Sequence, residues 1–535
     1  MPSPFAIQDD SEFPAPSAVY NWRIYALAFC ASMGSSMFGY DSAFIGGAIT
    51  LPSFTSRFGL GNSSSEQSAA LSANIVSTFQ AGCFFGAIVA SFLADKFGCK
   101  FPLIACGLIY DVGAVVQVAS MGSIGMIYAG RALTGRRLAV GACTLIVPQY
   151  ISECSPPAIR GRLVGLFETV LQFSQLIGFW VNYGVNQNIS GASDAQWRIP
   201  FGLQLVPGTF LAMLMFLQPE SPRWLTKKGK TDQAIDSLCR VRLLARDDDY
   251  IAWEVDSIKE QLRHESESGT TRPLVAKFKE MLQIGNRRRV ILGMSIMMLQ
   301  NLSGINALNY YSPTIFKSIG FSGTSVGLLA TGIFGLVKAL ATLVFMCFGI
   351  DNLGRRKSML IGSVGAMVAM FYLGGYSKIS GSFNHVVKQD GGAYVAIVMI
   401  YIFAVFYAMS WNGIPWVFCA EIFPTGIRSV CLVFTTCTQW LGQFIIVYST
   451  PYMMTNITYG TFLFFGCFLV VGMLVVFFLM PETKGLSLED MDILFSIEGS
   501  AVTQRRKADE IIATQRAAEN VVTLKEEGQH KDEEA

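Results

Sequence analysis

The sequence predicts an all-α membrane protein with about twelve transmembrane helices, arranged as two halves of six helices. Three observations predict this fold class. Charged residues make up only 15% of the chain and hydrophobic residues 52%, whereas soluble domains carry about 25% charged residues. The apolar residues occur in long runs, and the runs 395–411 and 462–480 contain no charge. Similar loop motifs recur in the same order in both halves of the chain.

The apolar runs place the predicted helices in chain order. The first half contains 23–49, 71–94, 101–119, 125–148, 163–184 and 200–217. The second half contains 289–312, 324–349, 358–376, 393–418, 430–450 and 461–480. The charged segment between the halves includes amphipathic stretches such as TDQAIDSLCRVRLLA. We therefore expect five parts: a cytosolic N-terminal tail (1–22), a six-helix bundle (23–217), a cytosolic linker with short helices (218–288), a second six-helix bundle (289–480) and a cytosolic C-terminal tail (481–535).

Basic loops indicate which side of the membrane is cytosolic. DKFGCK, RGR, NRRR, DNLGRRK and EIFPTGIR carry Lys or Arg, whereas the loops near 50–70, 185–199, 377–392 and 451–460 are poorer in them. This bias predicts that both termini are cytosolic. Asn62, Asn188 and Asn456 then face outside as candidate glycosylation sites, although such triplets also occur by chance.

The loop motifs pair between the two halves. DKFGCK pairs with DNLGRRK, ECSPPAIRGR with EIFPTGIR, and PESPRW with PETKG. Cytosolic turns that need Gly and Arg are one explanation for such recurrence. Three matched pairs in matched order instead favour an internal repeat of six helices, which is typical of transporters that rock two halves about a central site.

Several classes of protein are disfavoured. The net charge of +2 does not indicate the strongly basic surface that is typical of a nucleic-acid-binding protein. The 12 cysteines lie mostly in apolar runs without metal-ligand spacing. No nucleophile–base pair or phosphate loop is evident, so we expect neither an enzyme nor a cofactor. The polar, Pro-rich N-terminus is not a secretory signal peptide.

The motifs PESPRW, DNLGRRK, QNLSGIN followed by YYSP, and PETKG closely resemble the sugar porter family of the major facilitator superfamily. The resemblance covers residues from about 20 to 495. The stretches VYNWRIY, GYDSAFIG, LSANIVSTFQAG, GFWVNYGV and TGIFGLVKA are similar to fungal quinate permeases and sugar-acid transporters. The resemblance implies the major facilitator fold, alternating access and a central hydrophilic cavity. Many fungal members are proton symporters.

The resemblance also implies two sets of charged residues. Asp41 and Arg131 match the positions of a proton switch, although a static structural ion pair is the alternative. The loop motifs imply a cytosolic gate, made of Asp95, Glu153, Arg160, Arg162, Glu220, Arg223, Asp351, Arg355, Arg356, Glu421, Arg428 and Glu482. Asp41 and Arg131 are predicted at membrane depth, where a charge is costly, so each of the two is treated as a candidate functional residue.

Polar and aromatic side chains are the candidate substrate ligands. Glu168, Gln172 and Gln175 share one helix face, which lines the cavity or else packs against another helix. The resemblance implies contacts from Gln300, Asn301, Asn306, Tyr310, Asn412, Trp416, Gln439 and Trp440. Amides suit polyols because each offers both donors and acceptors. The alternative for the two tryptophans is helix packing.

Lys338 lies in the apolar run TGIFGLVKALATLVF. Gly335 replaces an asparagine that many neutral-sugar porters use to contact substrate, and Lys338 lies one turn further on the same face. An ammonium group at this position could bind the carboxylate of an acidic substrate. The alternatives are that Lys338 pairs with Glu168 or another acid, or that it extends to the membrane surface.

Helix four departs from the family pattern. The stretch GRALTGRRLAVGACTLIVPQY is about two residues longer, and it places Arg136 and Arg137 near the membrane centre. Either the sequence carries a mis-predicted splice junction or the helix is locally broken.

We therefore predict a monomeric, multi-pass plasma-membrane transporter that takes up D-galacturonate or quinate with protons. It needs no cofactor beyond the proton gradient, and its partners are the substrate, protons and the lipid bilayer. The alternatives are a neutral hexose or pentose symporter and a non-transporting nutrient sensor.

Overall fold

The computed structural model describes residues 15–60, 64–135, 139–267, 274–320, 323–383, 390–424, 426–484, 486, 490–497, 499–512 and 514. All regular secondary structure within these ranges is helical, which confirms the predicted fold class. The long or paired helices of the first half are α1 (Trp22–Ala48), α3 (Ser65–Phe97), α4 (Lys100–Val118), α5 (Ile124–Gly135), α6 (Val140–Cys154), α7 (Arg160–Asn188), α8 (Ala195–Gly202) and α9 (Leu205–Leu217).

The corresponding helices of the second half are α14 (Ile284–Leu302), α15 (Ile305–Ser318), α16 (Thr324–Val344), α18 (Arg355–Ser380), α19 (Gly391–Ala408), α20 (Ile414–Ile422), α21 (Arg428–Asn456) and α22 (Gly460–Leu479). The shorter helices are α2 (Pro52–Arg57), α10 (Pro222–Lys227), α11 (Thr231–Arg242), α12 (Asp249–Glu267), α13 (Leu274–Met281), α17 (Ile350–Leu353) and α23 (Asp490–Ser496). A π-helical turn, Phe345–Gly349, follows α16.

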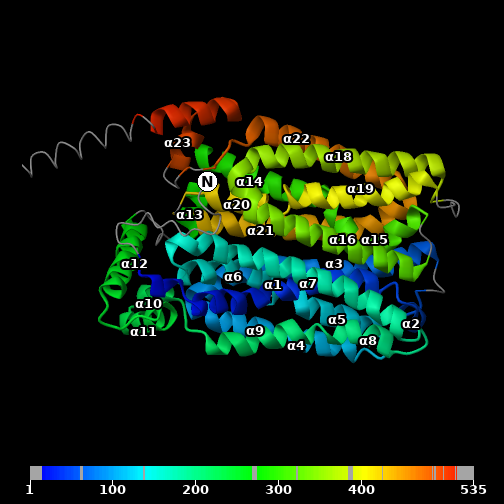
Figure 1. The fold of residues 1–535 in the computed structure, drawn as a ribbon, viewed down its shortest axis with the longest axis horizontal. Helices are drawn as coiled ribbons and strands as arrows, with labels where there is room; N and C mark the ends of the chain where they lie inside the picture. Colours follow the sequence, from blue (N-terminus) through cyan, green and yellow to red (C-terminus); the bar gives the residue numbers. More distant parts are fainter. Residues whose placement is uncertain are drawn as a thin grey trace, which may run out of the picture.

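Ten stretches in the described part of the chain are long and apolar enough to cross a membrane. Two of them, Ala195–Leu217 and Ile284–Ser318, each consist of two helices that meet at a break. α1 and the pair α5–α6 lie alongside these stretches (Figure 1). Together they form two sets of six membrane-crossing segments.

The two halves lie side by side with their helices roughly parallel, and α10 to α12 and α23 lie at one end of the bundle (Figure 1). Three helix pairs join the halves: α3 with α21, α7 with α16, and α1 with α15. The interior of each half is apolar, and large apolar side chains also cover its outer surface. An apolar outer surface is expected where lipid replaces water as the solvent.

Several membrane segments are broken near mid-length. Gly304, with a φ of 92°, separates α14 from α15, and residues 409–413 separate α19 from α20. α6 begins at Val140, and Ala139 before it has a φ of −87° and a ψ of −108°, which is not helical, so the predicted fourth helix has a break next to the stretch where the sequence departs from the family pattern. Arg136 and Arg137 lie outside the described residues. Broken helices free backbone groups to bind ligands at membrane depth.

Gly46 allows the closest approach between the halves. A Cβ atom at Gly46 would lie 2.1 Å from the carbonyl oxygen of Tyr310 on α15. We expect Gly46→Ala to push α1 away from α15 and to lower the melting temperature of the purified protein by about 5 °C. Gly184→Ala on α7 is the matched control, because no described atom lies within 4 Å of its added methyl group. Equal melting curves for the two variants would contradict this account of the interface.

Candidate functional site

A buried ion pair lies between α1 and α5. Arg131 donates to Asp41 at 3.2 Å and 3.5 Å, and both side chains are fully buried. The guanidinium also lies over the ring of Phe79, 5.5 Å from its centroid. A charge pair removed from water is stable only while both partners stay together. A change in the protonation of Asp41 would therefore alter the position of Arg131.

The polar face of α7 divides between two neighbours. Gln175 donates to the Ser42 hydroxyl of α1 at 3.1 Å. Gln172 instead donates to Glu168 at 2.7 Å and to Asn412 at 3.4 Å. Asn412 donates to the same Glu168 oxygen at 2.7 Å. Because Asn412 follows α19 in the second half, Glu168 and Gln172 form a polar bridge across the centre of the molecule.

The residues predicted on helix seven form two hydrogen-bond networks. Gln300 donates to the carbonyls of Trp411 and Asn412 at 2.6 Å and 3.0 Å, at the break between α19 and α20. Asn301 donates to the Gln439 side chain at 2.7 Å and accepts from Asn306 at 2.7 Å. These bonds hold the broken ends of two helices beside the bridge from α7.

Lys338 is 2% exposed, although it lies on an apolar helix. Its ammonium donates to the Asn309 side chain of α15 at 3.1 Å. Among the described residues, Lys338 forms no ion pair with Glu168 or any other acid. Thr342 lies one turn further along α16 and accepts a weak bond of 3.4 Å from Asn412. The Lys338 amino group, held by a neutral amide, therefore lies at the same buried centre.

Three amide oxygens at this centre have no hydrogen-bond donor in the described part of the chain. They belong to Gln172, Gln175 and Gln300, and each is buried. A buried acceptor without a donor costs about 1–3 kcal/mol. A ligand rich in hydroxyl groups could supply the missing donors, while Lys338 offers N–H groups to an anion. The centre thus combines hydrogen-bond acceptors that lack donors with an N–H donor from Lys338.

The aromatic candidates differ in their surroundings. Trp416 on α20 is only partly buried. Trp440 on α21 is 1% exposed and packs edge-on against Phe38 and Phe79. Tyr310 is fully buried, and its hydroxyl accepts from Gln443 at 3.0 Å. Trp440 and Tyr310 therefore join helices, whereas Trp416 keeps an accessible face.

The first half closes one end of its bundle, the end with the predicted gate residues, around Glu220. The Glu220 carboxylate accepts from the backbone N–H groups of Cys99 and Lys100, at the start of α4. A carboxylate at a helix N-terminus is favourable because the first N–H groups lack partners within the helix. Gly98, with a φ of 84°, allows this approach. Glu153 accepts from Ser221, the next residue after Glu220.

The second half repeats this arrangement around Glu482. Its carboxylate accepts from the N–H groups of Arg355 and Arg356, at the start of α18, after Gly354 with a φ of 82°. Glu421 accepts from Thr483 at 2.6 Å and pairs with Arg355 at 2.9 Å. The matching contacts give a structural basis for the predicted internal repeat.

The other predicted gate residues lie at the same end of the bundle. Asp95 pairs with Lys227 at 2.9 Å, Arg223 donates to Gln261, and Arg428 donates to the Phe423 carbonyl. Arg160 and Arg162 are exposed, and the side chain of Asp351 lies outside the described part. The described ion pairs at this end connect residues within one half.

Two of the three candidate glycosylation sites lie within the described residues. Asn188 ends α7 and Asn456 ends α21, and both are exposed. Asn62 lies outside the described residues.

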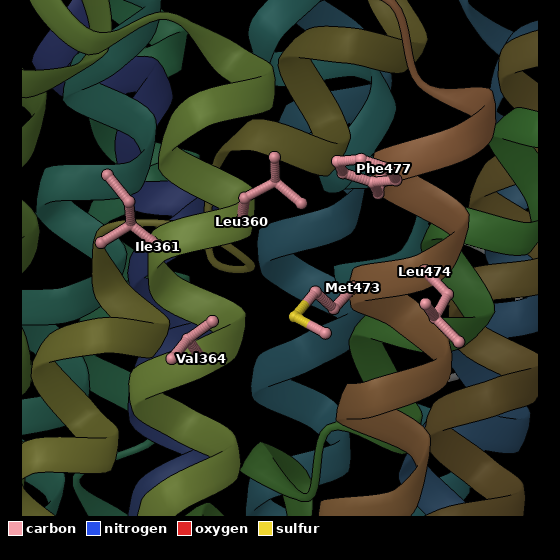
Figure 2. Close-up of a pocket in the computed structure, with 6 residues that line it drawn as sticks. All are labelled: Leu360, Ile361, Val364, Met473, Leu474 and Phe477. Carbon is pink, nitrogen blue, oxygen red and sulfur yellow. The ribbon is translucent and has the colours of Figure 1, made fainter. Parts of the chain in front are cut away.

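A separate hollow between α18 and α22 is entirely apolar. It is lined by Leu360, Ile361, Val364, Met473, Leu474 and Phe477 (Figure 2). Phe477 and Ile361 are about half exposed on the outer surface. This hollow offers no group that could bind a polar substrate, so the candidate site remains the polar centre between the halves.

Sequence reasoning did not identify several polar residues of the centre. Asn309 holds Lys338, Thr342 contacts Asn412, and Ser42 holds Gln175. Helical spacing could have indicated two of them, because Asn309 lies three residues after Asn306 and Thr342 four after Lys338. Ser42 directly follows Asp41, and no predicted site residue lies three or four positions from it, so helical spacing did not indicate it.

Two similar halves around a buried polar centre, with broken helices beside it, are the architecture of a membrane carrier. Residues 27–495 match the family model described as sugar (and other) transporter. The chain is 43% identical over 494 residues to the probable quinate permease of Aspergillus niger, covering 91% of this chain and 90% of that protein. It is 40% identical over 515 residues to the quinate permease of Neurospora africana, covering 95% and 94%.

A solved structure shares the fold. The chain superposes on the proton:xylose symporter XylE bound to 6-bromo-6-deoxy-D-glucose with a TM-score of 0.72 and 26% identity, covering 89% of this chain and 99% of that one. The chain therefore belongs to the sugar transporter family of the major facilitator superfamily. It is a multi-pass membrane transporter of small molecules, and not an enzyme.

Proposed function

We propose that this transporter takes up a small polyhydroxy monocarboxylate, with quinate as the preferred substrate and D-galacturonate as the related alternative, together with protons. The observation that carries the proposal is the buried Lys338 ammonium, held by Asn309 without an acidic partner in the described residues. A buried cation is costly unless an anion neutralises it. The similarity to two quinate permeases supports the same substrate class.

In the proposed cycle, Lys338 binds the substrate carboxylate. The unpaired amide oxygens of Gln172, Gln175 and Gln300 accept hydrogen bonds from its hydroxyl groups, and Trp416 covers one side of the ring. Closure of the outer side and opening of the cytosolic side then expose the substrate to the cytosol.

Proton coupling is assigned to Asp41 and Arg131. Protonated Asp41 releases Arg131 in the outward-open state. After the substrate is bound and the halves rock, Arg131 approaches Asp41 again, and the proton leaves toward the cytosol. The buried pair at 3.2 Å corresponds to the deprotonated state of this switch. We place the protein in the plasma membrane as a monomer with both termini in the cytosol, following the positions of the basic loops.

Uptake by intact cells tests the proposed substrate. Transporter-deficient yeast expressing the full chain is given labelled quinate, galacturonate or glucose, at acidic and at neutral external pH. We expect saturable uptake of an acid that is faster at acidic pH, because the proton gradient then drives entry. Uptake of glucose without uptake of either acid would identify a neutral-sugar symporter and overturn the proposal. No uptake of any substrate by correctly inserted protein would favour a nutrient sensor.

A further inference from the structure

Glu168 and Lys338 carry opposite charges at the polar centre but do not pair. One Glu168 oxygen accepts from Gln172 and from Asn412, each at 2.7 Å. The Lys338 amino group instead donates to Asn309 on α15. Asn412 connects the two regions, because it also donates to Thr342, which is bonded to the Lys338 carbonyl. Two amides thus hold the carboxylate back from the ammonium.

We propose that Glu168, although it forms no direct ion pair with Lys338, compensates part of the charge of this lysine across the polar centre of the empty carrier, and that it competes with the substrate carboxylate for Lys338. This inference rests on the proposed function, because it requires an anionic substrate. Glu168 then sets the affinity for the anion without contacting it. Gln172 is a positioning residue that keeps Glu168 at a distance.

The physical reason is the cost of an isolated charge in a site with little water. Without substrate, a nearby carboxylate reduces the cost of the Lys338 ammonium while the empty carrier reorients. With substrate, the same carboxylate repels the anion that Lys338 binds. A direct Glu168–Lys338 ion pair would block the substrate, whereas complete removal of Glu168 would slow the release of the anion and leave Lys338 uncompensated while the empty carrier reorients. The observed restraint by two amides lies between these extremes.

Other charged groups around α7 already have partners or lie at its ends. Lys338 is the titratable residue of α16, the helix of the second half that packs against α7. The remaining titratable groups on packed helices include Tyr40 and Asp41 on α1, Tyr150 and Glu153 on α6, and Arg198 on α8. Asp41 is paired with Arg131, Glu153 is bonded to Ser221, and Arg198 is paired with Asp194. Lys338 is therefore the cation available to Glu168 among these groups.

Binding of quinate to the purified full-length protein tests the competition. Glu168→Gln removes the charge but retains an oxygen that can accept from Gln172 and Asn412. We expect its dissociation constant for quinate to fall by about tenfold, since a like charge near the anion is gone. Binding of neutral glucose should not change in the same direction. Asp194→Asn, which removes an exposed carboxylate at the end of the bundle, is the matched control.

A second variant tests whether Gln172 restrains Glu168. Here the expected change in quinate binding is weaker binding instead of tighter binding. Gln172→Leu removes one of the two amides that hold Glu168, so Glu168 can approach Lys338 and quinate should bind more weakly. In the double variant Glu168→Gln/Gln172→Leu the part of this weakening that comes from Glu168 should disappear, which leaves only the loss of the bond between Gln172 and a substrate hydroxyl. An equal weakening by Gln172→Leu with and without Glu168 would mean that Gln172 acts only as a substrate ligand and does not restrain Glu168.

Transport kinetics give an independent readout. In proteoliposomes, Glu168→Gln should lower both the KM for quinate and the maximal rate of net uptake, while quinate–quinate exchange continues. Weaker or unchanged quinate binding in Glu168→Gln would overturn the inference, since Glu168 would then be a substrate ligand or a packing residue. Two different results would overturn the proposed function and not only the inference on Glu168. The wild-type protein would not bind quinate, or Lys338→Ala would bind quinate as tightly as the wild type does.

Discussion

Lys338→Ala is expected to lower quinate uptake by at least about 30-fold, because truncating one partner of a buried charge pair costs about 2 kcal/mol or more. The substrate carboxylate would then enter a poorly solvated centre without a cation, and the loss should appear mainly as weaker binding. Glucose uptake, if present, should change much less, since a neutral sugar does not need the ammonium. The measurement is initial uptake of labelled quinate and glucose at matched surface expression.

Two further variants make the Lys338 result specific. Lys317→Ala removes an exposed lysine near the end of α15 and should leave uptake unchanged. Lys338→Arg keeps the positive charge and should restore part of the quinate uptake, although a guanidinium has a different shape. Quinate uptake by Lys338→Ala at the wild-type rate would show that the lysine is structural and would remove the basis for an anionic substrate.

Asp41→Asn is expected to abolish accumulation of substrate against a gradient while exchange across the membrane continues. Asparagine resembles a permanently protonated aspartate, so it cannot carry a proton from one side to the other. The carrier can still alternate with substrate bound, which preserves exchange. The measurement compares net uptake under an inward proton gradient with counterflow of labelled substrate in the same proteoliposomes.

An acid elsewhere in the membrane provides the control for Asp41. Asp111 lies on α4 and accepts from Thr209 at 2.8 Å, away from the polar centre. Asp111→Asn should retain accumulation, although it changes the same functional group at a similar depth. Proton-driven accumulation by Asp41→Asn would refute the assignment of Asp41 to proton coupling, and loss of exchange as well would indicate a structural ion pair.

The sequence predicted the fold class because that class depends on composition and periodicity. A run of about 20 apolar residues forms a membrane helix wherever it occurs, since unsatisfied backbone groups are too costly in lipid. The breaks were harder to predict. The predicted helix 289–312 is divided at Gly304, and 393–418 is divided at residues 409–413. Both breaks contain glycine and polar residues, QNLSGIN and MSWNG, but each is short and lies between apolar residues, so hydropathy averaged over a membrane-length window still indicates one segment.

The candidate site was predicted less completely than the fold. The sequence identified Lys338 as anomalous, and pairing with Glu168 was one of the alternatives. The structure instead joins Lys338 to Asn309, 29 positions away, and holds Glu168 with amides from α7 and from the second half. Helix periodicity gives the face on which a side chain lies. It does not give which neighbouring helix contacts that face.

The sequence by itself determined that this is a multi-pass membrane protein, that it has two similar halves, which charges lie within the membrane segments, and which loop motifs recur at one end of the bundle. These depend on local chemistry: the length of apolar runs, the order of loop motifs and the cost of a charge in lipid. Only the tertiary structure decided the partner of each buried polar group. That choice depends on how helices from the two halves pack, because a hydrogen bond requires its atoms to lie within about 3 Å, whereas a sequence pattern locates a side chain only to one face of a helix.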